Sequence, residues 1–194
     1  FRSYDAFQAI VETEDVAQRV SIADAFLQNY PDSGMTAYVH HYMADAANQA
    51  NDVESFMLHA EKALLELPNT PELLAQLASL YSQKDQPLKA TEYANRALPL
   101  LDDLEKQGSI SSIQWVTMRR TLKADAHYAL GFSHLQRWHA SSIKPPKQLE
   151  QAIDHLNQAL ALAPDYAYAA FRLGFSQKQS DNMEAALSAS ARAA

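Results

Sequence analysis

Histidine and aspartate are the residue types in this chain whose spacing comes nearest to a chemical site. His41 and Asp45 stand four residues apart, so on a helix they share one face and could bind the same metal ion. His40 points to a different face, and no third ligand follows at a useful spacing. The pattern therefore predicts packed or solvated histidines, with His41 and Asp45 as the first ligands to examine if a metal were found.

Residues for covalent or phosphate chemistry do not form a set. The chain contains no cysteine, which excludes thiolate catalysis, disulfides and Cys-based zinc sites. It has no glycine-rich phosphate loop and no G-x-S-x-G serine motif. Paired carboxylates such as Asp102-Asp103 fall at helix ends and turns, where solvation explains them. We therefore expect a protein that is not an enzyme and has no cofactor.

Composition narrows the class of partner. The 194 residues carry a formal net charge of −7, so no excess of Lys and Arg is available for a nucleic-acid backbone. No apolar run approaches the ~18 residues that span a bilayer. Arg119, Arg120 and Lys123 form one local basic patch, which is either a solvated helix face or a contact for an acidic partner.

The elements that position these residues repeat along the chain. Three pairs of alanines have the same spacing of seven residues: Ala90 and Ala97, Ala152 and Ala159, and Ala186 and Ala193. The second and third pairs are offset by 34 residues, a period that marks a helical repeat array. In such an array each helix pair buries its core against its neighbours. We therefore expect an all-α solenoid, an α-α superhelix of helix hairpins.

Aligning the alanines divides the chain into one solenoid domain, 1–194. It comprises an atypical N-terminal helix pair (1–34), four hairpins (35–70, 71–101, 124–164 and 165–194) and a helical extension (102–123). The predicted helices are 4–11, 16–30, 38–49, one that ends at 67, 71–83, 87–101, 124–137, 146–163, 167–179 and 182–194. Thr70-Pro71 supplies an N-cap and a first-position proline, and Asp181 with Glu184 resembles a capping box for the last helix.

Two insertions interrupt the period. One lies in the loop Trp138–Lys147. The other falls within 102–123, where we expect extra turns on both facing helices, joined at Gln107-Gly108-Ser109. Trp115, Met118 and Leu122 lie on one helical stripe in this extension, which favours packing in a longer hairpin over a binding site.

The pattern resembles the tetratricopeptide repeat family from about Met35 to the end of the chain. Leu-Gly in the first helix, Ala-x6-Ala in the second and a closing proline are met by Leu130-Gly131, Ala152, Ala159 and Pro164. The tryptophan that the family often places early in the first helix is absent. The residues that stand there are His40, Leu74, His127 and Ala170. The resemblance implies a protein-interaction scaffold.

The resemblance also implies a binding face, because the family's first helices line a concave groove. The corresponding residues are Tyr38, His41, Asp45 and Asn48; Glu72, Ala75, Ser79 and Ser82; Asp125, Tyr128, Phe132 and Leu135; and Tyr168, Phe171, Phe175 and Lys178. The residues that we expect to bind a peptide or helix are Tyr38, His41, Tyr128, Phe132, Leu135, Tyr168, Phe171 and Phe175. Among them Tyr128, Phe132, Phe171 and Phe175 should form one partly exposed apolar patch. Alternatively, Phe132 and Phe175 pack between hairpins.

Two functions remain open at this stage, both for a protein partner whose identity and stoichiometry the residues do not reveal. The first is capture of a peptide in the groove; the family's Lys/Asn carboxylate clamp is absent, since His41 and Asp45 replace it in the first hairpin. The second is a structural spacer or assembly domain of a larger protein. The segment Ala25–Ser33 resembles repeat endings of bacterial envelope proteins, which favours the envelope or periplasm, and it also fits a helix end followed by a turn.

Overall fold

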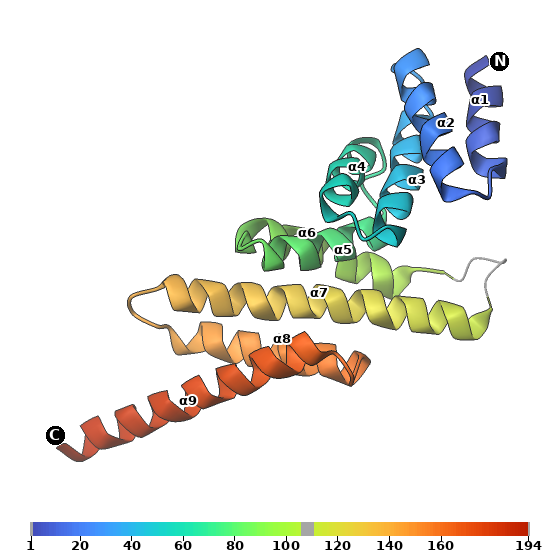
Figure 1. The fold of residues 1–194 in the computed structure, drawn as a ribbon. Helices are drawn as coiled ribbons and strands as arrows, with labels where there is room; N and C mark the ends of the chain where they lie inside the picture. The colour runs from blue at the N-terminus through green and yellow to red at the C-terminus, as the bar shows by residue number, and fades with distance from the viewer. Residues whose placement is uncertain (1, 106–110, 194) are drawn as a thin grey trace. The chain divides into compact units, whose positions relative to one another are not determined.

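The computed structural model describes residues 2–105 and 111–193, with side chains as far as Met183. All regular structure in these ranges is α-helical (Figure 1). The helices are α1 (Arg2–Glu12), α2 (Val16–Asn29), α3 (Thr36–Gln49), α4 (Val53–Glu66), α5 (Pro71–Gln83), α6 (Pro87–Asp103), α7 (Ser112–Ala140), α8 (Pro146–Leu162) and α9 (Ala167–Ala193). Neighbouring helices pack on each other, which confirms the predicted all-α solenoid class. Within the described ranges, no helix has the length and apolarity that crossing a bilayer requires.

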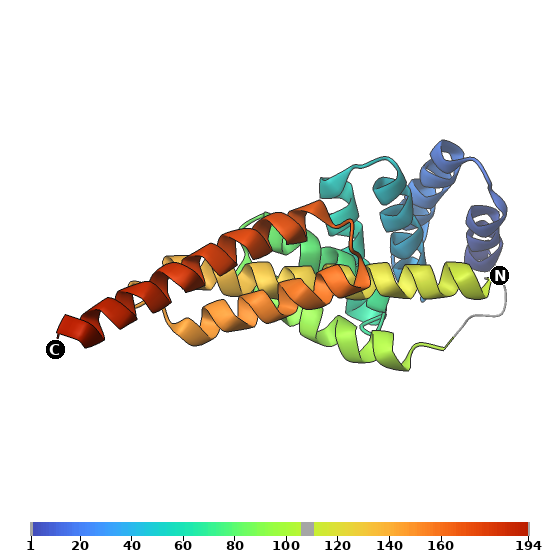
Figure 2. The ribbon, with the colours of Figure 1, turned by 90° about the horizontal axis from the view of Figure 1, so that it is seen from below.

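The helices form two compact units, Phe1–Leu73 and Leu74–Ala194, which we call unit 1 and unit 2. In unit 1, α2 packs on α1 and α3, and α3 packs on α4. In unit 2, α7 packs on α6 and α8, and α8 packs on α9. Figure 2 shows α7 and α8 side by side. Each helix buries its apolar face against its neighbours in the chain, as stacked hairpins require.

Asn51 and Asp85 end the first helices of two hairpins in the same conformation. They stand 34 residues apart, and both have a left-handed backbone, with φ of 56° and 57°. The amide that follows each of them donates to the carbonyl oxygen five residues earlier, at 2.9 Å in both turns. This is a Schellman helix end. Its recurrence shows that the predicted period is a period of structure.

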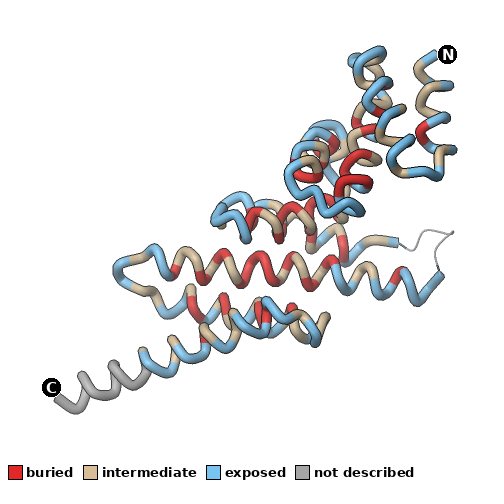
Figure 3. The backbone as a smooth tube through the Cα atoms, viewed as in Figure 1, coloured by how far each residue is buried: buried red, intermediate tan, exposed pale blue. Residues whose placement is uncertain are grey.

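The repeated alanines lie at close helix contacts. Ala90, Ala97, Ala152 and Ala159 have no exposed surface, which confirms the expected burial. In Figure 3 the buried residues recur along the middle of α7. Alanine at these positions lets two helices approach, because a larger side chain would hold them apart.

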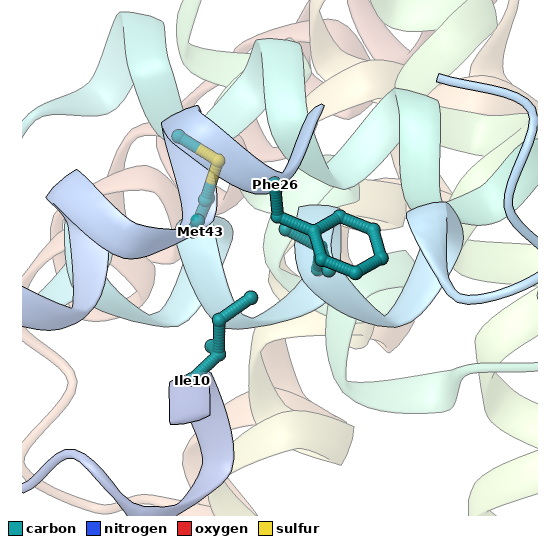
Figure 4. Close-up of a cluster of buried hydrophobic side chains, with 5 residues drawn as sticks. Ile10, Phe26 and Met43 are labelled. Atoms are coloured by element: carbon teal, nitrogen blue, oxygen red, sulfur yellow. The ribbon is translucent and has the colours of Figure 1, made fainter. Parts of the chain in front are cut away.

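The N-terminal helix pair shares a core with α3. Ile10, Phe26 and Met43 come from three successive helices and point toward one another (Figure 4). Ala23 and Val39 complete the buried cluster. This core holds α1 and α2 as the first layer of unit 1.

The insertion before the third predicted hairpin lengthens mainly one helix. α6 ends at Asp103, two residues beyond the prediction, whereas α7 is a single helix of 29 residues that begins at Ser112. Ser111 caps it through a capping box with Gln114. Trp115 and Leu122 are buried, as the predicted stripe requires. The predicted joint at Gln107-Gly108-Ser109 lies outside the described residues.

The last hairpin differs from the prediction. The sequence predicts helices over 167–179 and 182–194, but the structure has one helix, α9, that continues to Ala193. Asp181 therefore lies inside a helix and not at an N-cap. The intended break, Ser180-Asp181-Asn182, contains neither glycine nor proline, and none of the three has the left-handed backbone of Asn51 and Asp85. Without such a residue the intrahelical hydrogen bonds can continue through the segment.

Candidate functional site

The start of α9 carries two exposed aromatic residues. Tyr168 and Phe171 are 68% and 67% exposed, and three residues apart they share a helix face. The guanidinium of Arg172 lies 4.1 Å from the ring centroid of Phe132 on α7 and 5.5 Å from that of Phe171. Arg172 therefore links the two helices. We call Phe132, Tyr168, Phe171 and Arg172 the aromatic surface.

Two predicted groove residues of α7 are core residues instead. Tyr128 is 2% exposed, and its ring lies 5.0 Å from that of Tyr166; Leu135 is 1% exposed. The prediction that Tyr128 belongs to a partly exposed patch is therefore wrong. The physical reason is that α6 and α8 pack on α7 and α9 also contacts it, so little of its surface faces water.

Phe132 and Phe175 occupy intermediate positions. Both are half-buried and pack on the cluster formed by Leu135, Trp138, Leu149 and Ala152. The ring of Phe175 also lies 5.3 Å from that of His139. Packing between hairpins, the alternative interpretation of these two phenylalanines, therefore describes a large part of their surroundings.

The predicted groove residues of unit 1 are more open. Tyr38 is 46% exposed and meets the ring of Phe7 edge-on at 6.3 Å. His41 is half-buried, and its Nε2 lies 4.0 Å from a carboxylate oxygen of Asp45. Burial raises the pKa of Asp45, while the charges of His41 and Arg19 oppose the increase. Among the described residues no three His, Cys, Asp or Glu side chains are grouped so that they could hold a metal ion.

Asp125 and Tyr166 form a polar contact inside unit 2. Burial raises the pKa of Asp125 to about 6, although a hydrogen bond with Tyr166 works in the opposite direction. Burial and the charge of Asp125 raise the pKa of Tyr166, whose hydroxyl also bonds to Ser79. Ser79, Ala75 and Ser82 are buried, so these three predicted groove positions of α5 do not offer an open face.

Two pairs of histidines occupy equivalent places in two hairpins. The Nδ1 atoms of His40 and His59 lie 2.9 Å apart, and those of His127 and His155 lie 3.2 Å apart. His40 and His127 stand where the family often has tryptophan, and each faces a histidine of the second helix. One ring nitrogen must donate and the other accept, so these contacts require neutral rings. The ring of His134 stacks on that of His155 at 5.8 Å.

The surroundings of the pairs disfavour protonation. Burial lowers the pKa of His40 to about 4, and His59 and Lys62 lower it further. Burial also lowers the pKa of His127 to about 4, with help from His155 and Lys123 and against Asp154 and Asp102. The pKa of His134 is about 4 through burial, Arg137 and His155. Sequence reasoning noted His40 and His127 separately, but only the fold shows their partners.

The predicted basic patch is partly engaged. Arg120 donates to the carbonyl oxygen of Leu162 at 2.7 Å, and Lys123 bonds to Asp102 at 2.5 Å. These contacts tie the start of α7 to the end of α8 and to the end of α6. They account for two of the three basic side chains by packing between neighbouring helices.

Comparison with known proteins gives one distant similarity. No protein-family model matches the chain. It is similar to the anaphase-promoting complex subunit CDC16 of Saccharomyces cerevisiae, with 25% identity over 142 residues, an alignment that covers 62% of this chain. The chain spans only 16% of the length of that protein.

Proposed function

We propose that this chain is a non-catalytic scaffold of tetratricopeptide type that holds a partner protein on the aromatic surface of unit 2. The observation that carries the proposal is the pair Tyr168 and Phe171, two large side chains largely in water on one helix face. Neighbouring exposed aromatic residues often mark an interaction site, and aromatic residues are frequent energetic anchors of interfaces.

Arg172 supplies the polar part of this surface. Its Nε is buried and has no hydrogen-bond partner among the described residues. A buried donor without a partner costs free energy, which a carbonyl or carboxylate oxygen of a bound segment would recover. The surface therefore suits a peptide or helix that offers an apolar side chain next to an oxygen acceptor.

The architecture and the comparison support the same role. The hairpin turn recurs after 34 residues in the same conformation, and stacked hairpins present extended surfaces for binding. The yeast protein that the chain resembles is, by its name, a subunit of a multi-protein complex. A chain that helps to hold proteins together fits both observations.

Site-specific photocrosslinking in the source cell tests the proposal. A photoreactive phenylalanine analogue at position 171 is expected to crosslink a recurrent protein, whereas the same analogue at Ile143 is not. Ile143 is the matched control, because it is an exposed apolar residue of the same unit. Tyr168→Ala and Phe171→Ala should abolish recovery of that protein, and Ile143→Ala should not. Identical crosslinks at both positions would favour the spacer or assembly domain instead.

A further inference from the structure

Unit 1 contains a hollow of about 620 Å³ lined by α2, α3 and α4, which we call the α3 hollow. Ala46, Ala47 and Met43 of α3 form its floor, and Val20 of α2 forms part of one wall. Ligand pockets in proteins span roughly 300–1,000 Å³ and are mostly apolar. The hollow is therefore large enough to accept several apolar side chains of a partner.

The hollow exists because α2 and α4 both pack on α3 over a segment with short side chains. Ala46 and Ala47 are almost fully buried under the neighbouring helices, yet they are too small to fill the space above them. Ala17 and Ala50, which also line the hollow, are exposed. The apolar floor is thus reached from solvent.

Two carboxylates stand at the edge of this floor, Asp24 on α2 and Asp52 at the start of α4. Both residues are exposed. Asp52 accepts hydrogen bonds from the hydroxyl and the backbone amide of Ser55, at 2.7 and 3.1 Å, and these bonds lower its pKa. Asp52 therefore presents a negative charge at neutral pH.

The charge of the chain is distributed unevenly in the same sense. Unit 1 contains twelve Asp and Glu residues and three Lys and Arg residues, a formal charge of −9. Unit 2 contains eleven acidic and thirteen basic residues, a formal charge of +2. Unit 1 accordingly attracts cationic partners and repels anionic ones.

We infer that the α3 hollow binds a basic amphipathic segment of a partner protein, with apolar side chains on the alanine floor and Lys or Arg side chains at Asp24 and Asp52. The inference rests on the proposed scaffold function and adds a second contact with its own chemistry. The hollow and the aromatic surface belong to different units and can be altered separately.

Fluorescence anisotropy with two labelled peptides tests the inference on the full chain. One peptide is an amphipathic helix of Leu, Ala and Lys, and the other has Glu in place of every Lys. We expect the basic peptide to bind with an affinity that falls as salt is added, and the acidic peptide not to bind. Equal binding of both peptides, or binding of neither, would overturn the inference.

Paired variants locate the site. Asp24→Asn with Asp52→Asn should weaken binding about tenfold, because each exposed ion pair contributes a factor of a few. Asparagine can still cap α4, so the helix should keep its start. Asp5→Asn with Glu66→Gln removes the same charge from exposed positions of unit 1 that do not line the hollow, and should change binding less than twofold. Equal losses in the two double variants would mean general attraction to unit 1 and no site.

Two further measurements separate the remaining outcomes. Ala17→Leu places bulk in the hollow and should weaken binding, whereas Ala25→Leu, also exposed on α2 but outside the hollow, should not. Phe171→Ala should leave peptide binding unchanged, so that failure here and failure of the aromatic surface are distinguishable. If sedimentation shows a dimer that the Asp24 and Asp52 variants dissociate, the occupant is a second copy and the inference of a basic partner segment is wrong.

Discussion

Gly131 of α7 lies so close to Leu156 of α8 that a Cβ atom on the glycine would stand 2.8 Å from the leucine Cγ. The same atom would stand 3.1 Å from the carbonyl oxygen of Ala152, which is part of the α8 backbone. The leucine can move at some cost, but the carbonyl can move only with its helix. The Leu-Gly position of this hairpin is therefore a point of close helix approach.

Gly131→Ala is expected to lower the free energy of unfolding by about 1–3 kcal/mol through overpacking, although alanine is the better helix former. Gly174→Ala is the matched control, because no described atom lies within 4 Å of the position of its Cβ. There the substitution should raise stability by about 0.5–1 kcal/mol. Urea denaturation of both variants checks this, and equal changes at the two glycines would contradict the close contact.

These two glycines show what the sequence could predict about the fold. Both stand in the same Leu-Gly-Phe-Ser pattern, and most helix bounds follow from such local signals: proline starts, capping residues and the alanine period. Only one glycine has a helix packed against it. Whether α9 breaks after Gln179 depends on the balance between propagating one helix and closing a hairpin, and no single residue type reveals that balance.

The candidate site was predictable to a smaller extent. Repeat position correctly placed Tyr168 and Phe171 on an open face, but it also placed Tyr128 and Leu135 there, and these two are buried. Exposure at a given repeat position depends on which helices pack over it, which is a tertiary property. The α3 hollow had no sequence signal either, because alanines on a helix are equally common where the packing is complete.

Ala159→Leu should destabilise the protein by about 1–3 kcal/mol, because Ala159 has no exposed surface and the added atoms must displace α7 or α9. Ala161→Leu, at an exposed position of the same helix, should change stability by less than about 0.5 kcal/mol. Thermal unfolding followed by circular dichroism compares the two. A similar melting temperature for both would show that the register of α8 is wrong.

Tyrosine truncation distinguishes core from surface in unit 2. Tyr128→Ala should cost about 3–5 kcal/mol, as for other buried aromatic side chains, since Tyr128 is 2% exposed. Tyr168→Ala removes the same atoms from a residue that is 68% exposed and should cost less than about 1 kcal/mol. Guanidinium denaturation provides both values. A large loss at Tyr168 would mean that this residue stabilises the fold and is not available to a partner.

The histidine pairs predict that stability falls in mild acid. Burial lowers the pKa of His40, His127 and His134 to about 4, against 6.5 in an exposed chain. Between these values the unfolded chain binds protons that the folded chain does not. The contribution of these rings is therefore complete above pH 6.5 and is lost as the pH falls toward 4. Asp125 acts in the opposite direction, because its pKa of about 6 lets the folded state bind a proton over part of the same range.

Three proteins measured between about pH 7 and pH 5 test this balance. His59→Gln combined with His155→Gln removes one ring from each pair and keeps a side chain that can donate and accept hydrogen bonds. Without the second ring, a proton on His40 or His127 no longer faces a neighbouring imidazole, so the melting temperature should fall less with acid than in the parent protein. Asp125→Asn removes the opposing carboxyl group, so its melting temperature should fall more. If all three proteins show the same dependence on pH, the paired histidines do not control acid stability.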